Sequence, residues 1–197
     1  MSTRLPAAER RQQLLDVAVT TFSEQGYRNT SMNDIAEAAG VTKPVLYQHF
    51  SSKRELVLEL LSELGGRLRA ALSSSAAQAG SPRRQVEDGL LAYFRWIAEH
   101  QGGFQVLFSG DSRYDPDFLR EVARVEDEIA DNVASLIVVE GFDDARRRIL
   151  AMGIVGMAER AGRYWVRHSD DLDPDLLASQ VAELAWNGLR GLGQRAS

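Results

Sequence analysis

Four neighbouring side chains in the sequence have the chemistry needed to contact the edges of DNA bases. Lys43 can donate hydrogen bonds to O6 and N7 of guanine, and Gln48 can pair with the edge of an adenine. Pro44 and Val45 offer apolar contact to the methyl group of a thymine. The segment therefore predicts a surface that enters the major groove of DNA.

Three further residues are suited to the phosphate backbone. Tyr47, His49 and Lys53 carry donors that can bind phosphate oxygens. Lys53 is also expected in the first turn of a following helix, where backbone N–H groups and the helix dipole favour an anion. We interpret these three residues as groups that position the protein on DNA.

The distribution of charge agrees with a DNA contact at this end of the chain. The net charge over 197 residues is −5, which by itself argues against nucleic acid because phosphate binding needs lysine and arginine. Residues 1–54, however, hold seven Lys and Arg against five Asp and Glu, whereas residues 55–197 hold 16 against 23. The positive charge is thus gathered where the candidate DNA contacts lie.

Two short helices are needed to hold these side chains, and the sequence marks where both begin. Ser31 and Asp34 have the spacing of a capping box. Thr42 stands before a helix that opens with Lys43-Pro44, and proline is tolerated in the first turn because its missing N–H costs little there.

The connection between the two helices has the features of a helix-turn-helix. Ala36 is small enough to let the helices cross closely, and Gly40 can adopt the positive φ of the turn. A preceding helix over 7–25, which Gly26 ends in a left-handed conformation, provides a third wall. The apolar residues expected to hold the pair against that wall are Ile35, Ala39, Val41, Leu46 and Phe50.

The segments Thr30–Thr42 and Leu46–Lys53 together resemble the signature of the TetR family of transcriptional regulators. The resemblance implies a homodimer that binds a palindromic operator in double-stranded DNA and is released when a small effector, bound in the C-terminal domain, shifts the fourth helix. Lys43-Pro44-Val45 departs from the commoner small-residue pattern of the family, so base preference is not carried over. The candidate DNA contacts are Ser31, Asn33, Thr42, Lys43, Pro44, Val45, Tyr47, Gln48, His49 and Lys53.

The rest of the chain predicts an all-α fold of about nine helices. Apolar residues recur at spacings of three and four, without a convincing alternating strand pattern. Ser52 and Glu55 are expected to cap a long fourth helix with a leucine stripe, in which Gly65-Gly66 permits a bend. Later helices are expected over 82–99, 104–108, 116–139, 144–166 and 174–192.

These elements predict three parts of the chain. The small, polar segment Ser73–Ser81 is expected to be a linker. We therefore expect a helix-turn-helix DNA-binding domain at 1–52, a connecting helix and linker at 53–80, and a ligand-binding and dimerisation domain at 81–197.

The C-terminal domain is interpreted as a sensor for an apolar or amphipathic effector such as an acyl compound. Arg163 lies in an otherwise apolar helix, so it forms a surface salt bridge, or is buried in an ion pair, or binds an anionic ligand head. The alternative for the bulky residues is that most of them are simply core. The side chains that can line a cavity are Tyr93, Trp96, Phe104, Phe108, Met152, Met157 and Tyr164.

The last two helices carry small residues at close spacing, which allow helix backbones to approach. In the resembling family these helices form the dimer interface, and we expect the same here in preference to plain core packing. The small residues are Gly153, Gly156 and Gly162 in one helix and Ala182, Ala185 and Gly188 in the other.

Two other classes of function remain. An enzyme would need a catalytic or metal motif; His49, His100 and His168 lack metal spacing, the Gly110-Asp111-Ser112 block has no preceding strand, and Asp171, Asp173 and Asp175 lack the other features of a calcium loop. A DNA-binding protein without an effector, or an activator, is the other alternative. We expect no cofactor, no metal and no membrane partner. We also expect a cytoplasmic location, since the sequence has neither a secretory signal nor a cysteine.

Overall fold

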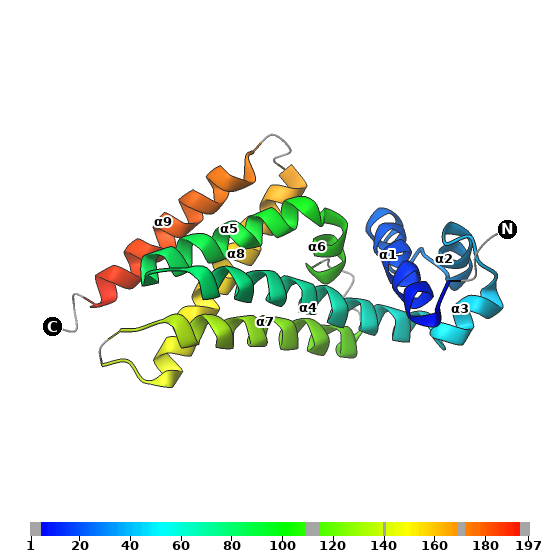
Figure 1. The fold of residues 1–197 in the computed structure, drawn as a ribbon, viewed down its shortest axis with the longest axis horizontal. Helices are drawn as coiled ribbons and strands as arrows, with labels where there is room; N and C mark the ends of the chain where they lie inside the picture. The colour runs from blue at the N-terminus through cyan, green and yellow to red at the C-terminus, as the bar shows by residue number, and fades with distance from the viewer. Residues whose placement is uncertain (1–4, 109–114, 140, 169–171, 194–197) are drawn as a thin grey trace. The chain divides into compact units, whose positions relative to one another are not determined.

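The computed structural model describes residues 5–108, 115–139, 141–168 and 172–193. Over these ranges the chain forms nine helices and no strand (Figure 1). The prediction of an all-α fold with about nine helices is confirmed. None of the helices in the described ranges combines the length and the apolar character needed to cross a membrane.

The helices follow the predicted order closely. Their bounds are α1 Ala7–Gln25, α2 Met32–Ala38, α3 Lys43–His49, α4 Lys53–Gln78, α5 Pro82–Glu99, α6 Gln101–Phe108, α7 Pro116–Leu136, α8 Asp144–His168 and α9 Pro174–Gly193.

The main difference concerns the expected linker at Ser73–Ser81. Helix α4 continues to Gln78, so only a short turn separates it from α5. Alanines before and after the serines favour helix, and Ser73 accepts a hydrogen bond from Asn132 Nδ2 at 3.4 Å. The small, polar composition was therefore a poor guide to where the helix ends.

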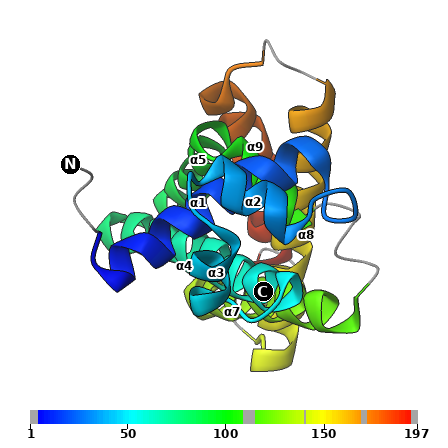
Figure 2. The ribbon, with the colours of Figure 1, turned by 90° about the vertical axis from the view of Figure 1, so that its right-hand side faces the viewer.

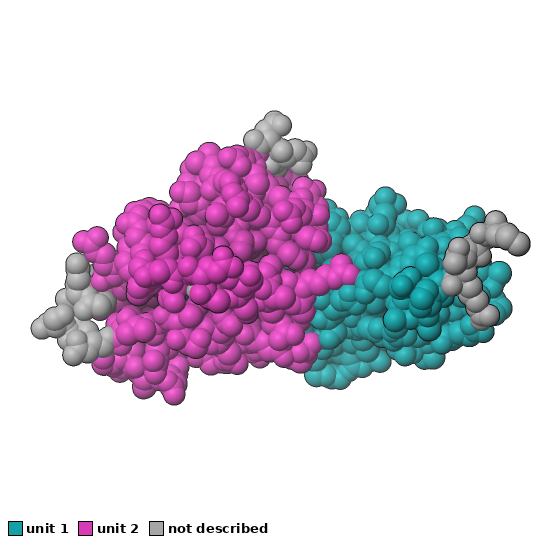
Figure 3. All heavy atoms as spheres, in the orientation of Figure 1, with its two compact units in different colours: residues 1–64, 102–122 teal, residues 65–101, 123–197 magenta. Residues whose placement is uncertain are grey.

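The helices form two compact units (Figure 3). Unit 1 comprises residues 1–64 and 102–122, and unit 2 comprises residues 65–101 and 123–197. These bounds differ from the expected domains, because α6 and the start of α7 belong with the N-terminal helices and α4 contributes to both units.

Unit 1 is built on a cluster of α1, α2 and α3 (Figure 2). Helix α1 buries Leu14, Leu15, Ala18 and Phe22. Gly26 ends α1 with φ +79°, as its positive-φ role predicts, but with an extended ψ of 157° in place of a left-handed helical one. The later part of the sequence joins this unit through Phe118 of α7, whose ring meets Tyr27 edge-on with the centroids 5.2 Å apart.

Unit 2 is a separate helical bundle. Helices α5 and α9 run side by side in it (Figure 1). Phe94 of α5 is fully buried and meets the ring of Trp165 from α8 at 6.2 Å between centroids. The indole N–H of Trp165 donates to the Leu172 carbonyl at 3.1 Å, so the buried ring keeps its polar atom satisfied.

Gly65 has a packing role that the sequence did not show. Helix α4 continues through Gly65-Gly66, the pair that permits a bend. A Cβ at Gly65 would lie 2.3 Å from Val125 Cγ2, whereas a Cβ at Gly66 would meet only Arg69 Nη2 at 3.9 Å. Gly65 thus permits α4 and α7 to pack closely within unit 2.

We predict opposite effects of alanine at these two positions. Gly65→Ala should destabilise the protein by about 1–3 kcal/mol because the new methyl group overpacks against Val125. Gly66→Ala should stabilise it by about 0.5–1 kcal/mol through helix propensity alone. Urea unfolding of the full chain measures both, and adding Val125→Ala should recover part of the Gly65→Ala loss. Equal stability of the two alanine variants would refute the packing role.

Candidate nucleic-acid interface

The first helix of the candidate motif begins with the predicted capping box. Ser31 N donates to Asp34 Oδ2 at 2.7 Å, and Asp34 N donates to Ser31 Oγ at 3.3 Å. The backbone bond from Ser31, followed by its side-chain bond, holds the pKa of Asp34 below its usual value. The start of α2 is thus fixed by local chemistry, as the spacing predicts.

The turn between α2 and α3 depends on Gly40. Its φ is +65°, and a Cβ added there would meet nothing within 4 Å, so the backbone conformation alone calls for glycine. Val41 N donates to the Ala36 carbonyl at 2.9 Å and closes the turn. Ala36 is buried, which agrees with its expected place at the helix crossing.

Helix α3 is held in unit 1 mainly by the side chains on one face. Leu46 and Phe50 are completely buried, and so is Ile35 of α2. Ala39 is also buried, while Val41 is only half-buried. Thr42 occupies the N-cap position of α3 without a side-chain hydrogen bond. The tertiary contacts therefore matter more for α3 than its own cap.

The opposite side of α3 is open to solvent. We call Lys43, Pro44, Tyr47 and Gln48 the exposed α3 face, because all four are exposed and Tyr47 keeps 49% of its surface accessible. A large aromatic ring that is this exposed, on a helix whose other side is buried, suits a surface that binds a partner.

The other predicted DNA contacts lie around this face to different degrees. Ser31, Asn33 and Thr42 are exposed, and Val45 and His49 are half-buried. The His49 carbonyl accepts a hydrogen bond from Arg11 Nη1 at 2.5 Å. These contacts of Arg11 were not predicted from the sequence, because its partners come from distant parts of the chain.

Lys53 has a different environment from the one expected of a phosphate contact. Its ammonium group donates to the Tyr27 carbonyl at 2.7 Å and to the Thr30 carbonyl at 2.8 Å. It also lies 4.1 Å from the centroid of the Tyr27 ring. Desolvation lowers the pKa of Lys53, partly offset by the charge of Asp34. In this structure Lys53 braces the loop between α1 and α2.

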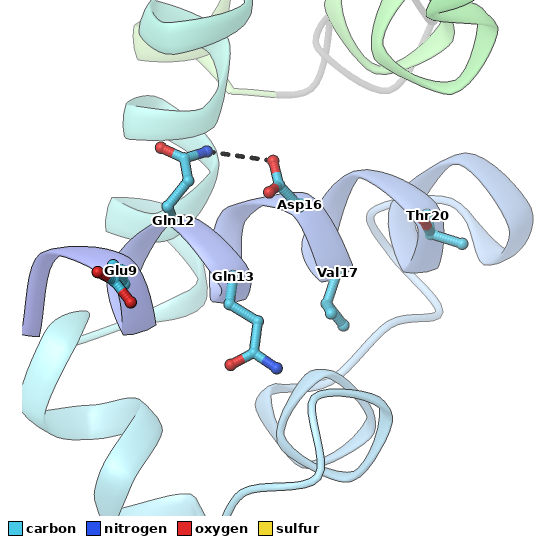
Figure 4. Close-up of a pocket in the computed structure, with 6 residues that line it drawn as sticks. All are labelled: Glu9, Gln12, Gln13, Asp16, Val17 and Thr20. Atoms are coloured by element: carbon cyan, nitrogen blue, oxygen red, sulfur yellow. Dashed lines mark hydrogen bonds between the residues drawn. The ribbon is translucent and has the colours of Figure 1, made fainter. Parts of the chain in front are cut away.

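A hollow along α1 has the wrong chemistry for DNA (Figure 4). Its volume is about 530 Å³, and Gln12 Nε2 donates to Asp16 Oδ1 at 3.1 Å beside it. Its lining contains two carboxylates and no lysine or arginine, so it would repel phosphate. The lining residues are Glu9, Gln12, Gln13, Asp16, Val17 and Thr20.

The predicted effector residues are divided between the two units. Phe104 and Phe108 are buried in unit 1, where their rings lie 4.9 Å apart. Tyr93 and Trp96 are buried in unit 2, and Met157 is half-buried there. Buried aromatic side chains are thus present in both units.

Met152 and Tyr164 lie elsewhere. They are 42% and 64% exposed on α8, which does not fit the lining of an enclosed cavity within this chain. Twelve residues separate Met152 from Tyr164, which places them about 120° apart around the axis of α8.

Arg163 is largely buried and forms an ion pair with Glu159 one turn earlier on α8. The side chains keep only 18% and 19% of their surfaces accessible. Burial raises the pKa of Glu126, and the neighbouring charge of Glu159 raises it further. Burial also raises the pKa of Tyr93. Arg163 therefore sits among carboxylates, so an anionic ligand head would have to compete with Glu159.

Across the part of the chain that is described, no group of three His, Cys, Asp or Glu side chains is arranged to hold a metal. Gly110-Asp111-Ser112 and Asp171 lie outside the described residues.

Comparisons with known proteins identify both halves of the chain. Residues 14–60 match the family of bacterial regulatory proteins called tetR, and residues 82–188 match the tetracyclin repressor-like C-terminal domain.

Individual relatives agree with these matches. The chain is 34% identical to the HTH-type transcriptional activator FasR of Mycolicibacterium smegmatis, over 94% of this chain and 85% of that protein. It is 27% identical to the HTH-type transcriptional repressor KstR2 of Mycobacterium tuberculosis, over 92% and 80%.

Solved structures share the fold. A TetR-like transcriptional regulator from Rhodococcus has a TM-score of 0.78 at 32% identity, covering 95% of this chain and all of that one. FadR from Bacillus subtilis, in complex with stearoyl-CoA, also has a TM-score of 0.78, at 19% identity over 88% and 96% of the two chains.

If the exposed α3 face binds DNA, substitutions at Lys43 and at Tyr47 should have different effects on DNA affinity. Lys43→Ala should relax base preference at one position of a DNA duplex selected from a random pool, by about 1–3 kcal/mol. Tyr47→Phe, which removes only a hydroxyl, should weaken binding to the selected duplex and to its shuffled sequence by the same factor. Fluorescence anisotropy measures both affinities, and Arg167→Ala in unit 2 controls for the loss of one positive charge. Unchanged DNA binding in both α3 variants would rule out this face as the interface.

Proposed function

Because the chain belongs to the TetR family and is a DNA-binding transcriptional regulator, we propose that it binds a palindromic operator as a homodimer and that a small effector bound in unit 2 releases it. The exposed α3 face is the observation that supports operator binding most directly. It presents Lys43 and Gln48 beside an exposed Tyr47 on a helix whose other side is buried. Ser31, Asn33, Thr42, Val45 and His49 flank it as further proposed contacts.

Two copies are needed for a palindrome, and α8 and α9 offer a surface for this. Ile149 and Leu184 are 70% and 65% exposed, although both are large and apolar. A Cβ added at Gly153, Gly156 or Gly188 would meet nothing within 4 Å. We define the α8/α9 surface as Ile149, Met152, Gly153, Gly156, Tyr164, Leu184 and Gly188. Gly162, Ala182 and Ala185, which were also expected at the interface, are buried within the chain and lie outside this surface.

Small residues beside exposed apolar ones allow the helices of a second copy to pack closely. A dimer through this surface would carry two α3 helices, which must lie about 34–36 Å apart to enter successive major grooves on one side of DNA. The spacing of the operator half-sites would then follow from the dimer.

We propose that the effector is apolar or amphipathic. The buried aromatic residues Tyr93 and Trp96 of unit 2 support an apolar site, and Arg163 is already neutralised by Glu159. Recognition of the effector would then depend on its apolar part more than on an acidic head. FadR from Bacillus subtilis has this fold and was solved with stearoyl-CoA, so acyl compounds are the first class to test.

Activation in place of repression is the second candidate. It is favoured by one specific observation, the 34% identity to FasR, which is named a transcriptional activator. The other relative compared above, KstR2, is named a repressor. Repression and activation would use the same exposed α3 face and differ only in where the operator lies relative to a promoter.

A single charge in the α8/α9 surface should disrupt the dimer without unfolding the protein. Leu184→Glu is expected to give a folded monomer whose affinity for the selected palindrome falls by about 100-fold or more, because linked half-sites no longer reinforce each other. Light scattering and anisotropy measure these changes. Leu119→Glu, on an equally apolar exposed residue of α7, should remain dimeric and bind DNA. A Leu184→Glu dimer with full operator affinity would contradict the proposed interface.

The effector class can be tested by thermal unfolding with a fatty acid, the alcohol of the same chain length and the acyl-CoA. A ligand at about a hundredfold excess over its dissociation constant stabilises by about 3 kcal/mol. We expect the acid and the alcohol to stabilise the chain similarly, and Arg163→Gln to leave that similarity unchanged. Stabilisation by the acid alone, lost in Arg163→Gln, would instead make Arg163 the anion site. No stabilisation by any of the three would refute an acyl effector.

A further inference from the structure

Arg11 of α1 contacts the C-terminal end of α3 and also pairs with a residue of α4. Its Nη1 donates to the His49 carbonyl at 2.5 Å, and its guanidinium carbon lies 4.3 Å from the centroid of the Phe50 ring. The remaining donors form a bidentate pair with Glu59 of α4, in which Nε lies 2.6 Å from Oε1. One planar group thus ties together three helices of unit 1.

We propose that Arg11 is a positioning residue for DNA recognition, which fixes the direction in which the exposed α3 face enters the groove. This inference rests on the proposed operator binding. It gives Arg11 a role in base discrimination, although the structure places its guanidinium against protein groups on α3 and α4.

The apolar contacts of α3 do not fix its direction by themselves. Leu46 and Phe50 are one helical turn apart on one face, and apolar contact is non-directional, so the C-terminal end of α3 could still shift across that contact. A hydrogen bond to a backbone carbonyl weakens steeply when its angle departs from linear. The bond from Arg11 to His49 therefore supplies the orientation that Leu46 and Phe50 do not.

A small tilt is enough to matter for base contacts. Seven residues make α3 about 10 Å long, so a tilt of about 10° about its N-terminal end, which the Gly40 turn holds, would move the C-terminal end by about 2 Å and Gln48 by slightly less. That exceeds the range of donor–acceptor distances over which a base-edge hydrogen bond survives. Contacts to phosphate tolerate such a shift better, because attraction to a charged backbone falls off gradually with distance.

Glu59 of α4 orients the guanidinium group of Arg11. A guanidinium binds a carboxylate in a fixed plane, so Glu59 orients the one donor that reaches His49. Lysine at position 11 would keep the charge but lose the bidentate geometry. Substitutions at either residue should consequently change base discrimination in the same direction.

The test compares affinity for the selected palindrome with affinity for the same duplex carrying shuffled half-sites. Arg11→Lys and Glu59→Gln should each lower the ratio of these affinities by about tenfold, the size of one lost base contact, and leave shuffled-duplex binding unchanged. Arg10→Gln is the matched control, because Arg10 has the same charge on the same helix and donates to Gln13 within α1. Its ratio should stay at the wild-type value.

The salt dependence of binding separates positioning from direct phosphate contact. If Arg11 bound phosphate, Arg11→Gln would flatten the salt dependence for both duplexes, Arg11→Lys would restore it, and Glu59→Gln would not weaken binding. That pattern, or a wild-type affinity ratio in both Arg11→Lys and Glu59→Gln, would overturn the proposal. If the wild-type chain itself preferred no duplex, operator binding would fail instead. Far-UV circular dichroism of each variant ensures that folded protein is compared.

Discussion

The length of α3 constrains the rest of unit 1. A helix of seven residues is too short to be stable in water, where isolated helices need about 12 residues or more. The conformation of α3 is therefore set by its surroundings: the turn at Gly40 fixes one end, burial of Leu46 and Phe50 fixes one side, and Arg11 fixes the other end. The exposed α3 face can consequently present side chains to DNA in a defined geometry.

The body that supports α3 includes a part of the chain that is distant in sequence. Residues 102–122 belong to unit 1, where Phe118 packs on Tyr27 and Arg54 Nε pairs with Asp115 at 3.0 Å. Lys53, next to Arg54, holds the loop between α1 and α2. A rearrangement of α6 or of the start of α7 would act directly on this unit, and the chain also passes between the two units within α4.

Features encoded by residues close together in sequence were predictable, and long-range ones were not. The capping box of Ser31 and Asp34 and the positive φ of Gly40 are local, and the structure has both. The contacts of Arg11 were not predicted because its partners lie 38 and 48 residues away, and the packing of Gly65 was not predicted because its neighbour Val125 comes from another helix. Lys53 was expected at a phosphate, but whether its donors meet solvent or carbonyls depends on how the loop before α2 folds.

We propose that the exposed α3 faces of two copies of the chain bind DNA together. Hydroxyl-radical footprinting of the wild-type chain on its selected duplex tests this directly, because it maps contact along both strands. We expect two protected regions related by two-fold symmetry, with centres about 10 base pairs or a multiple of that spacing apart. A single protected region, or protection without a preferred sequence, would contradict it.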